Sequence, residues 1–183
     1  HLANILWLLG YPDQAQARSR EALVLAEEID HPTSMAVLWF MNTIFHQFLH
    51  EPQAVQQDAE ALVTLSNEQG FSALSAGVMV RRGWALAERG QEGEGIQQIH
   101  QGMAAHRATG VELYRPHHLA LLAEAYEKTG QVEEGLQALA EALTVVDKNG
   151  ERFYEAELYR LKGQLTLQQF NVQGSQFKVE SSK

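Results

Sequence analysis

The chain has 183 residues, of which 45% are hydrophobic and 20% charged, and it contains no cysteine. This composition excludes a disordered tail, a collagen-like chain, a disulfide-stapled secreted domain and a zinc-thiolate protein, because each would show in one of these numbers. With 14 Lys and Arg against 23 Asp and Glu, the formal net charge of −9 argues against nucleic acid as a partner, since phosphate binding needs clustered basic side chains.

The start of the chain carries no export or membrane signal. No apolar run approaches the ~20 residues that span a bilayer, and no basic stretch precedes an apolar one. We therefore expect no membrane partner, and the lack of cysteine favours a cytoplasmic location without proving it. The chain opens with His1 instead of Met and passes directly into the mostly apolar residues 2–7, which predicts a piece of a longer protein.

A turn residue recurs every 40 residues in two separate series. The first series is Gly10, His50, Gly90 and Gly130, and the second is Asp30, Gly70, Gly110 and Gly150. Glycine, and less readily Asn or Asp, accepts the left-handed backbone conformation that closes a helix. Two helix ends per repeat predict two helices per repeat.

These stops divide the chain into nine expected helices. Their predicted ranges are 2–9, 12–29, 33–49, 52–69, 72–89, 91–109, 113–129, 132–149 and 152–168. Pro12, Pro32, Pro52 and Pro116 each follow shortly after a stop, where first-turn amides lack an intrahelical partner and proline is tolerated. No proline interrupts a predicted helix.

The segments between the stops have the apolar period of helices. Leu119, Leu122, Ala123 and Tyr126, for example, recur at i, i+3, i+4 and i+7. A helix pair of this kind cannot bury its apolar stripe alone, so neighbouring pairs must stack on one continuous core. The predicted fold is all-α, an α-α solenoid with a 40-residue period and about four and a half repeats.

We expect one helical repeat domain over residues 1–168, followed by a polar tail or linker over residues 169–183. The last stretch is rich in Ser and Gln and breaks the helical period, which predicts flexibility. The alternation of Phe177 and Val179 leaves open a short strand that pairs with another chain.

Small residues recur at a spacing of 12 and then 7 residues. They are Ala3, Ala15 and Ala22, then Gly83, Gly95 and Gly102, then Ala123, Gly135 and Ala142. The repeat length favours HEAT or armadillo repeats, but this spacing resembles the tetratricopeptide repeat (TPR), in which small side chains let two helices approach closely. The resemblance covers residues 1–168 and implies a right-handed superhelix. The second repeat departs from it, with Thr43, Val55 and Leu62 at the small sites, which predicts looser packing or displaced helices.

A narrower resemblance concerns four phrases of the sequence, at residues 9–15, 83–87, 121–126 and 155–163. They look like the C-terminal repeat region of large bacterial signalling ATPases, which often carry an adenylate or guanylate cyclase or a LuxR/MalT-type output domain. In such proteins the repeat region is the sensor or partner-binding arm.

The sequence has no motif for catalysis or for a cofactor. Its glycines stand at helix ends instead of clustering after a strand, so a phosphate-binding loop, a dinucleotide motif and a nucleophile elbow are all missing. His46 and His50 have the i, i+4 spacing of two metal ligands, but the Glu of a His-Glu-x-x-His motif and a third ligand are missing. We expect no catalytic residue, no cofactor and no metal.

The TPR resemblance implies that the first helix of each repeat lines a concave groove. The groove positions are Phe40, Ile44, Gln47, Val80, Trp84, Ala87, His117, Ala120, Glu124, Glu127, Arg160 and Gln164. They lack the Lys, Arg and Asn pattern of a carboxylate clamp, which disfavours binding of a chaperone tail. Phe40, Ile44, Val80 and Trp84 form an apolar stripe that is either an exposed interaction site or packing between first helices.

These observations together predict a non-catalytic module that binds a protein or peptide, as the sensor or partner-binding arm of a larger signalling ATPase or cyclase. The partner is another protein or another domain of the parent. Two alternatives stay open, an oligomerisation scaffold that forms homo-oligomers and a sensor domain for a small effector.

Overall fold

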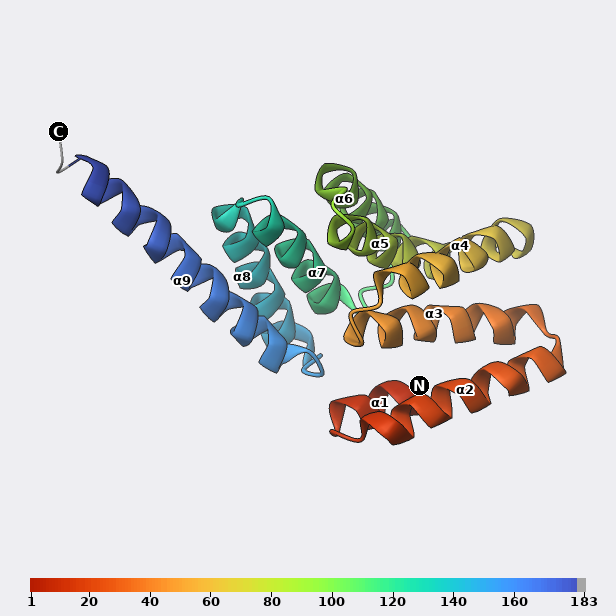
Figure 1. The fold of residues 1–183 in the computed structure, drawn as a ribbon. Helices are drawn as coiled ribbons and strands as arrows, with labels where there is room; N and C mark the ends of the chain where they lie inside the picture. The colour runs from red at the N-terminus through yellow and green to blue at the C-terminus, as the bar shows by residue number, and fades with distance from the viewer. Residues whose placement is uncertain (181–183) are drawn as a thin grey trace.

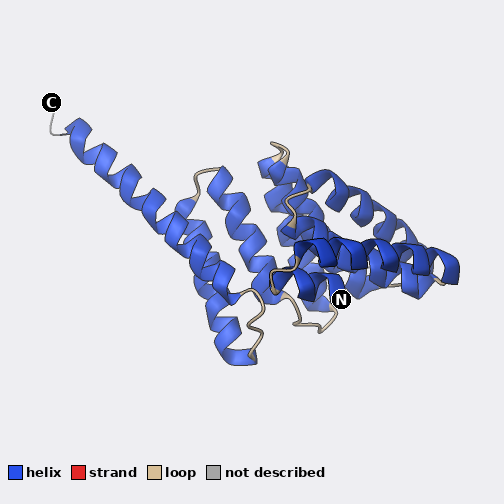
Figure 2. Ribbon diagram, turned by 60° about the horizontal axis from the view of Figure 1, so that its bottom comes forward, coloured by secondary structure: helices blue, strands red, loops and turns tan. Residues whose placement is uncertain are grey.

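The computed structural model describes residues 1–180, with side chains up to residue 171. Within this part of the chain it is all-helical, and Figure 2 shows helices joined by short loops without a strand. The elements are α1 (Leu2–Leu8), α2 (Pro12–Ile29), α3 (Pro32–Phe48), α4 (Pro52–Gln69), α5 (Ser72–Glu88), α6 (Glu92–Ala108), α7 (Arg115–Lys128), α8 (Val132–Asn149) and α9 (Glu155–Glu180). The predicted fold class is confirmed.

All eight predicted stops adopt a positive φ angle and follow the end of a helix. Asp30 (48°) and His50 (53°) do so without being glycine, and Gly150 has a φ of 76° and closes α8 with a hydrogen bond from its N–H to the Val146 carbonyl (2.8 Å). The 40-residue period is therefore a period of backbone geometry. One more left-handed residue, Tyr114 (67°), was not predicted and delays the start of α7 to Arg115.

Consecutive helices form antiparallel pairs that stack side by side (Figure 1). α5 contacts both α3 and α7 directly, and α1 and α9 continue the same row at its two ends. α2, α4, α6 and α8 pack on the outside of this inner row. Each of these outer helices buries one apolar face against the inner row, as α8 illustrates. Its Leu139 and Val146 are fully buried, while Glu133 and Glu141 on its other face are exposed.

The closest helix pair is α5 with α6, where the small-residue spacing falls on three glycines. A Cβ atom on Gly95 would lie 2.5 Å from the Gly83 carbonyl oxygen, and one on Gly102 would lie 2.8 Å from the Val80 nitrogen. In the second repeat, Thr43, Val55 and Leu62 fill the same positions and are fully buried. Because these side chains occupy the space between the helices, α3 and α4 approach each other less closely than α5 and α6 do.

The last helix is longer than predicted. α9 continues to Glu180, whereas the sequence pattern placed its end at residue 168. The stretch contains no proline, so nothing in it removes a backbone donor, and its lone glycine costs a helix only about 1 kcal/mol. The backbone around Phe177 and Val179 is helical, so the strand alternative is wrong. Residues 181–183 of the predicted tail lie outside the described residues, and the boundary between repeat domain and tail stays a prediction.

Candidate functional site

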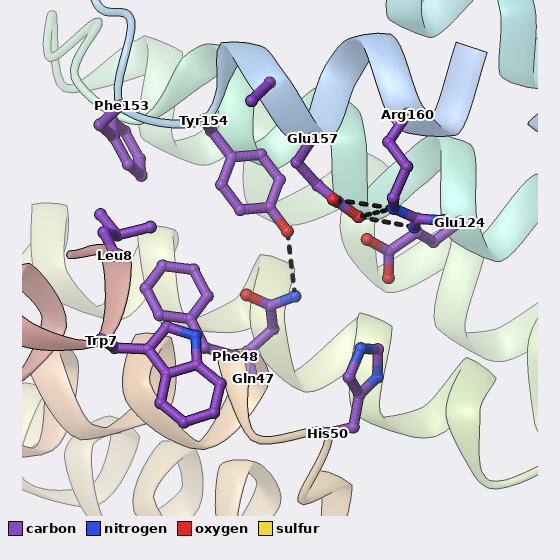
Figure 3. A pocket seen from close by; sticks show the side chains of 11 residues that line it. Trp7, Leu8, Gln47, Phe48, His50, Glu124, Phe153, Tyr154, Glu157 and Arg160 are labelled. Carbon is purple, nitrogen blue, oxygen red and sulfur yellow. Dashed lines mark hydrogen bonds and ion pairs between the residues drawn. The ribbon is translucent and has the colours of Figure 1, made fainter. Parts of the chain in front are cut away.

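A cleft of about 450 Å³ opens on the inner side of the solenoid, where the ends of α1, α3 and α7 meet the start of α9 (Figure 3). It is lined by Trp7, Leu8, Gln47, Phe48, His50, Glu124, Phe153, Tyr154, Ala156, Glu157 and Arg160. Figure 3 shows two halves, with the rings of Trp7, Phe48, Phe153 and Tyr154 on one side and Glu124, Glu157 and Arg160 on the other.

Three buried side chains tie α3, α7 and the start of α9 together behind the cleft. The Gln47 amide nitrogen donates to the Tyr154 hydroxyl (3.4 Å), and the Gln47 amide oxygen lies 3.1 Å from His117 Nε2. With the Gln47 amide oxygen as the acceptor, Nε2 of His117 is the donor in this contact. Burial, followed by the positive charge of Arg81, holds the pKa of His117 well below its usual value, so the ring is neutral. Phe48 stacks on Tyr154 at 6.0 Å between ring centroids.

Glu124 lies at the base of the charged half. The residue is 9% exposed, and its Oε2 accepts a hydrogen bond from the indole nitrogen of Trp84 (2.7 Å). Burial raises the pKa of Glu124 to about 7, the Trp84 hydrogen bond lowers it, and the nearby Glu88 and Glu157 raise it further. The group therefore changes charge close to neutral pH.

Arg160 and Glu157 stand at the rim of the cleft, one turn apart on α9. They form an ion pair (2.6 Å), and Arg160 Nη1 also donates to the Gln164 side chain (2.6 Å). The Gln164 amide donates in turn to Glu127, which is half-buried on α7. The guanidinium of Arg160 is thus already held by partners on its own helix.

The structure brings together part of the predicted groove. Gln47, Glu124 and Arg160 line the cleft, His117 lies directly behind Gln47, and Glu127 borders it through Gln164. Whether these residues bind a partner stays a prediction.

The exposed alternative for the apolar stripe is wrong. Phe40, Ile44, Val80 and Trp84 are between 0% and 4% exposed and belong to the core. The reason is the direct contact of α3 with α5, since Gly77 has no side chain and leaves room for the Phe40 ring. The alternative in which these side chains pack between first helices is confirmed.

Sequence reasoning missed the residues that α1, the α8–α9 connection and the first turn of α9 contribute, chiefly Trp7, Phe153, Tyr154 and Glu157. One signal was available, because Tyr154 follows Tyr114 at the 40-residue period and both come just before an inner helix. His46 and His50, which the sequence offered as a pair of metal ligands, contact different residues. His46 bonds Glu51 (2.7 Å), whereas the His50 ring lies 6.0 Å from that of Trp84. No group of three metal-ligating side chains occurs among the described residues.

A second buried charge lies deeper in the inner row. Arg81 is fully buried and donates one hydrogen bond, from Nη1 to the Gly77 carbonyl oxygen (3.1 Å). Its guanidinium carbon lies 4.5 Å from the Phe40 ring centroid and 5.4 Å from that of Tyr114. Burial lowers the pKa of Arg81 to about 10, so the side chain stays charged at neutral pH. Nε and Nη2 have no hydrogen-bond partner within the described residues.

No family model matches the chain. A relative from Rhizobium meliloti (strain 1021), the uncharacterized protein R02095, is 21% identical over 161 residues, which are 88% of this chain and 16% of the relative. The chain thus spans about a sixth of that relative's length. Among solved structures, the chain is similar to the nearly identical TPR-like repeats of a Podosopora anserina chain named as a kinesin light chain. The identity is 20%, the TM-score is 0.55, and the match covers 94% of this chain and 93% of the other. The likeness shows a TPR-like fold.

No described helix is long and apolar enough to cross a membrane.

Proposed function

We propose that this chain is a non-catalytic protein-interaction module that holds a segment of its partner in the cleft between α1, α3, α7 and α9. The observation that carries this proposal is the cleft itself, which combines four aromatic side chains with buried polar groups at its base. Concave, largely apolar sites with a few fixed polar groups are typical binding sites, and aromatic anchors dominate many protein interfaces.

The parent of the module is proposed to be a large cytoplasmic signalling ATPase or cyclase, in which the repeats form the sensor or partner-binding arm. The resemblance of the four sequence phrases supports this context, and the match to a short part of a much longer relative supports only the large size of the parent. Binding would bias the output of the parent by favouring one arrangement of the repeats over another.

Site-specific photo-crosslinking tests the cleft as the binding site. We would replace Phe153, which is 37% exposed at the cleft, with p-benzoylphenylalanine and irradiate cells that produce the protein. The matched control is the same replacement at Leu167, which is 67% exposed on α9 and outside the cleft. We expect a discrete adduct from position 153 alone, and Ala156→Trp, which fills the cleft, should remove it. Equal adducts from both positions would contradict the proposal.

An oligomerisation scaffold is the second candidate, favoured by apolar side chains that stay uncovered at the first repeat. Val24, Leu25 and Ile29 on α2 are between 53% and 56% exposed. Single apolar side chains are common on surfaces, but a contiguous group marks an interface. Sedimentation equilibrium of the chain and of Leu25→Glu distinguishes the candidates, because only a scaffold through this face would dissociate on substitution.

A further inference from the structure

One carboxylate oxygen in the charged half of the cleft accepts no hydrogen bond from the described residues. The inference drawn from it rests on the proposed function of the cleft. Trp84 occupies Oε2 of Glu124, and no described residue hydrogen-bonds to Oε1. Oε1 is not among the buried atoms that lack a partner, so it is open to the cleft, where a donor on a ligand can replace water. The missing group on the ligand is therefore a hydrogen-bond donor, and a cation is the strongest one.

Arg160 does not supply that cation. It lies near Glu124 and lowers the pKa of that carboxyl only as the smallest of several influences. Its own donors are directed to Glu157 and Gln164, at 2.6 Å each. With Glu157 and Arg160 paired, the ionised Glu124 leaves the charged half with an excess of one negative charge. An anionic ligand would meet this charge unfavourably.

The aromatic half sets a second requirement. Phe48 and Tyr154 are stacked with their planes 14° apart, and Phe153 packs beside Tyr154 at 5.9 Å between ring centroids. The parts of these rings that line the cleft can accept the apolar stem of a long side chain. A ligand that fits both halves has an apolar stem and a positive end.

We propose that the cleft binds a basic side chain of a partner protein, an arginine or a lysine, with its charge at Glu124 and its stem against Phe48 and Tyr154. The net charge of −9 supports the same choice, because a basic segment approaches an acidic protein favourably. The Glu124 carboxylate and the aromatic pair then act together as one recognition site.

Blocked tripeptides with a single central residue test the proposal directly. Isothermal titration calorimetry of the 183-residue chain would compare acetyl-Gly-Arg-Gly-amide, its lysine counterpart and its citrulline counterpart, which keeps the shape of arginine without the charge. We expect the arginine or the lysine peptide to bind at least tenfold more tightly than the citrulline peptide. Which of the two binds better identifies the natural side chain.

Two variants localise the effect. Glu124→Gln keeps an acceptor for Trp84 but removes the charge, and it should weaken binding of the basic peptide at least tenfold. Glu133→Gln removes an equally acidic but exposed side chain on α8 and should leave binding unchanged. Equal binding of arginine and citrulline peptides would overturn the inference while leaving the cleft as a binding site. If no peptide binds but the crosslink at position 153 persists, the inference fails alone; if the crosslink fails too, the proposed function fails with it.

Discussion

Two inner helices of the solenoid each bury one charged side chain, Arg81 on α5 and Glu124 on α7. Neither forms an ion pair among the described residues, and each makes one hydrogen bond, to the Gly77 carbonyl and from the Trp84 indole respectively. Burial shifts the pKa of each towards the neutral form, down to about 10 for Arg81 and up to about 7 for Glu124. The two sites start from the same physical difficulty.

They differ in what surrounds the charge. The Phe40 and Tyr114 rings cover the guanidinium of Arg81, which is completely removed from solvent, whereas Glu124 keeps 9% exposure at a cleft. Ring faces stabilise the Arg81 cation, and its complete burial leaves no opening through which a ligand could reach the two donors without a partner. The comparison teaches that a closed buried charge belongs to the fold, while one that opens into a cleft is available for binding.

The closed site should show its role in stability first. Arg81→Ala removes a large buried side chain and its ring contacts, and we expect it to lower the free energy of unfolding by about 4 kcal/mol, in the range of other large-to-alanine changes. Arg81→Met fills most of the volume without the charge and should stay within about 1 kcal/mol of the wild type. Urea denaturation followed by circular dichroism measures both.

If Arg81→Met proves as unstable as Arg81→Ala, the charge of Arg81 itself stabilises the closed site. The expectation that an apolar side chain of similar volume can replace it would then be wrong. Phe40→Leu then becomes the informative variant, because it removes one ring face while keeping the charge.

The open site should dominate a pH effect on stability. Glu124 has a pKa of about 7 when folded against an ordinary 4.5, so between these values the folded state holds a proton that the unfolded state has lost. The contribution of Glu124 to the free energy of unfolding is largest below pH 4.5. It falls as the pH rises towards 7 and is constant above that pH. The change is about 3 kcal/mol at most.

Other carboxyls titrate in the same range, so the measurement is a difference. Burial raises the pKa of Asp58 to about 6, for example. The unfolding free energy of the wild type minus that of Glu124→Gln should decline between pH 5 and pH 8. A flat difference would mean that Glu124 is well solvated and that the cleft reaches further than its 9% exposure indicates.

Ligand binding should have the opposite pH dependence. A cation favours ionised Glu124, so affinity for the basic tripeptide should rise about tenfold from pH 6 to pH 8. The groups that face Glu124 are Trp84 and Glu88 from α5, Glu157 and Arg160 from α9, with Tyr154 and His50 at the cleft.

Of these, His50 is a second ionisable side chain that lines the cleft, so replacing it is the control for Glu124. His50→Asn keeps a residue that tolerates the left-handed backbone, and it should preserve the pH profile. A pH profile that disappears in His50→Asn would contradict the assignment of the pH dependence to Glu124.

The fold could be predicted from the sequence because its signals are local. Each turn residue determines its own backbone angle, and Gly95 leaves space that only its immediate partner helix can use. The cleft could not be predicted from the sequence, because it depends on how helices that are far apart in the chain are arranged along the inner row. Only the stacking of the whole inner row places Gln47 beside Tyr154, which lies 107 positions further along the chain.

The smallest expected effect is a difference in unfolding free energy between phenylalanine variants of Tyr114 and Tyr154. These two tyrosines occupy equivalent positions of successive repeats. The Tyr114 ring covers Arg81 and its hydroxyl makes no hydrogen bond among the described residues, so Tyr114→Phe should change the unfolding free energy by less than about 0.5 kcal/mol. The Tyr154 hydroxyl accepts from the buried Gln47 amide, and Tyr154→Phe should cost about 1 kcal/mol. Thermal denaturation of both variants resolves this order. The reverse order would mean that the Tyr114 hydroxyl, not its ring, stabilises the closed site, and that the open site does not depend on the Gln47 contact.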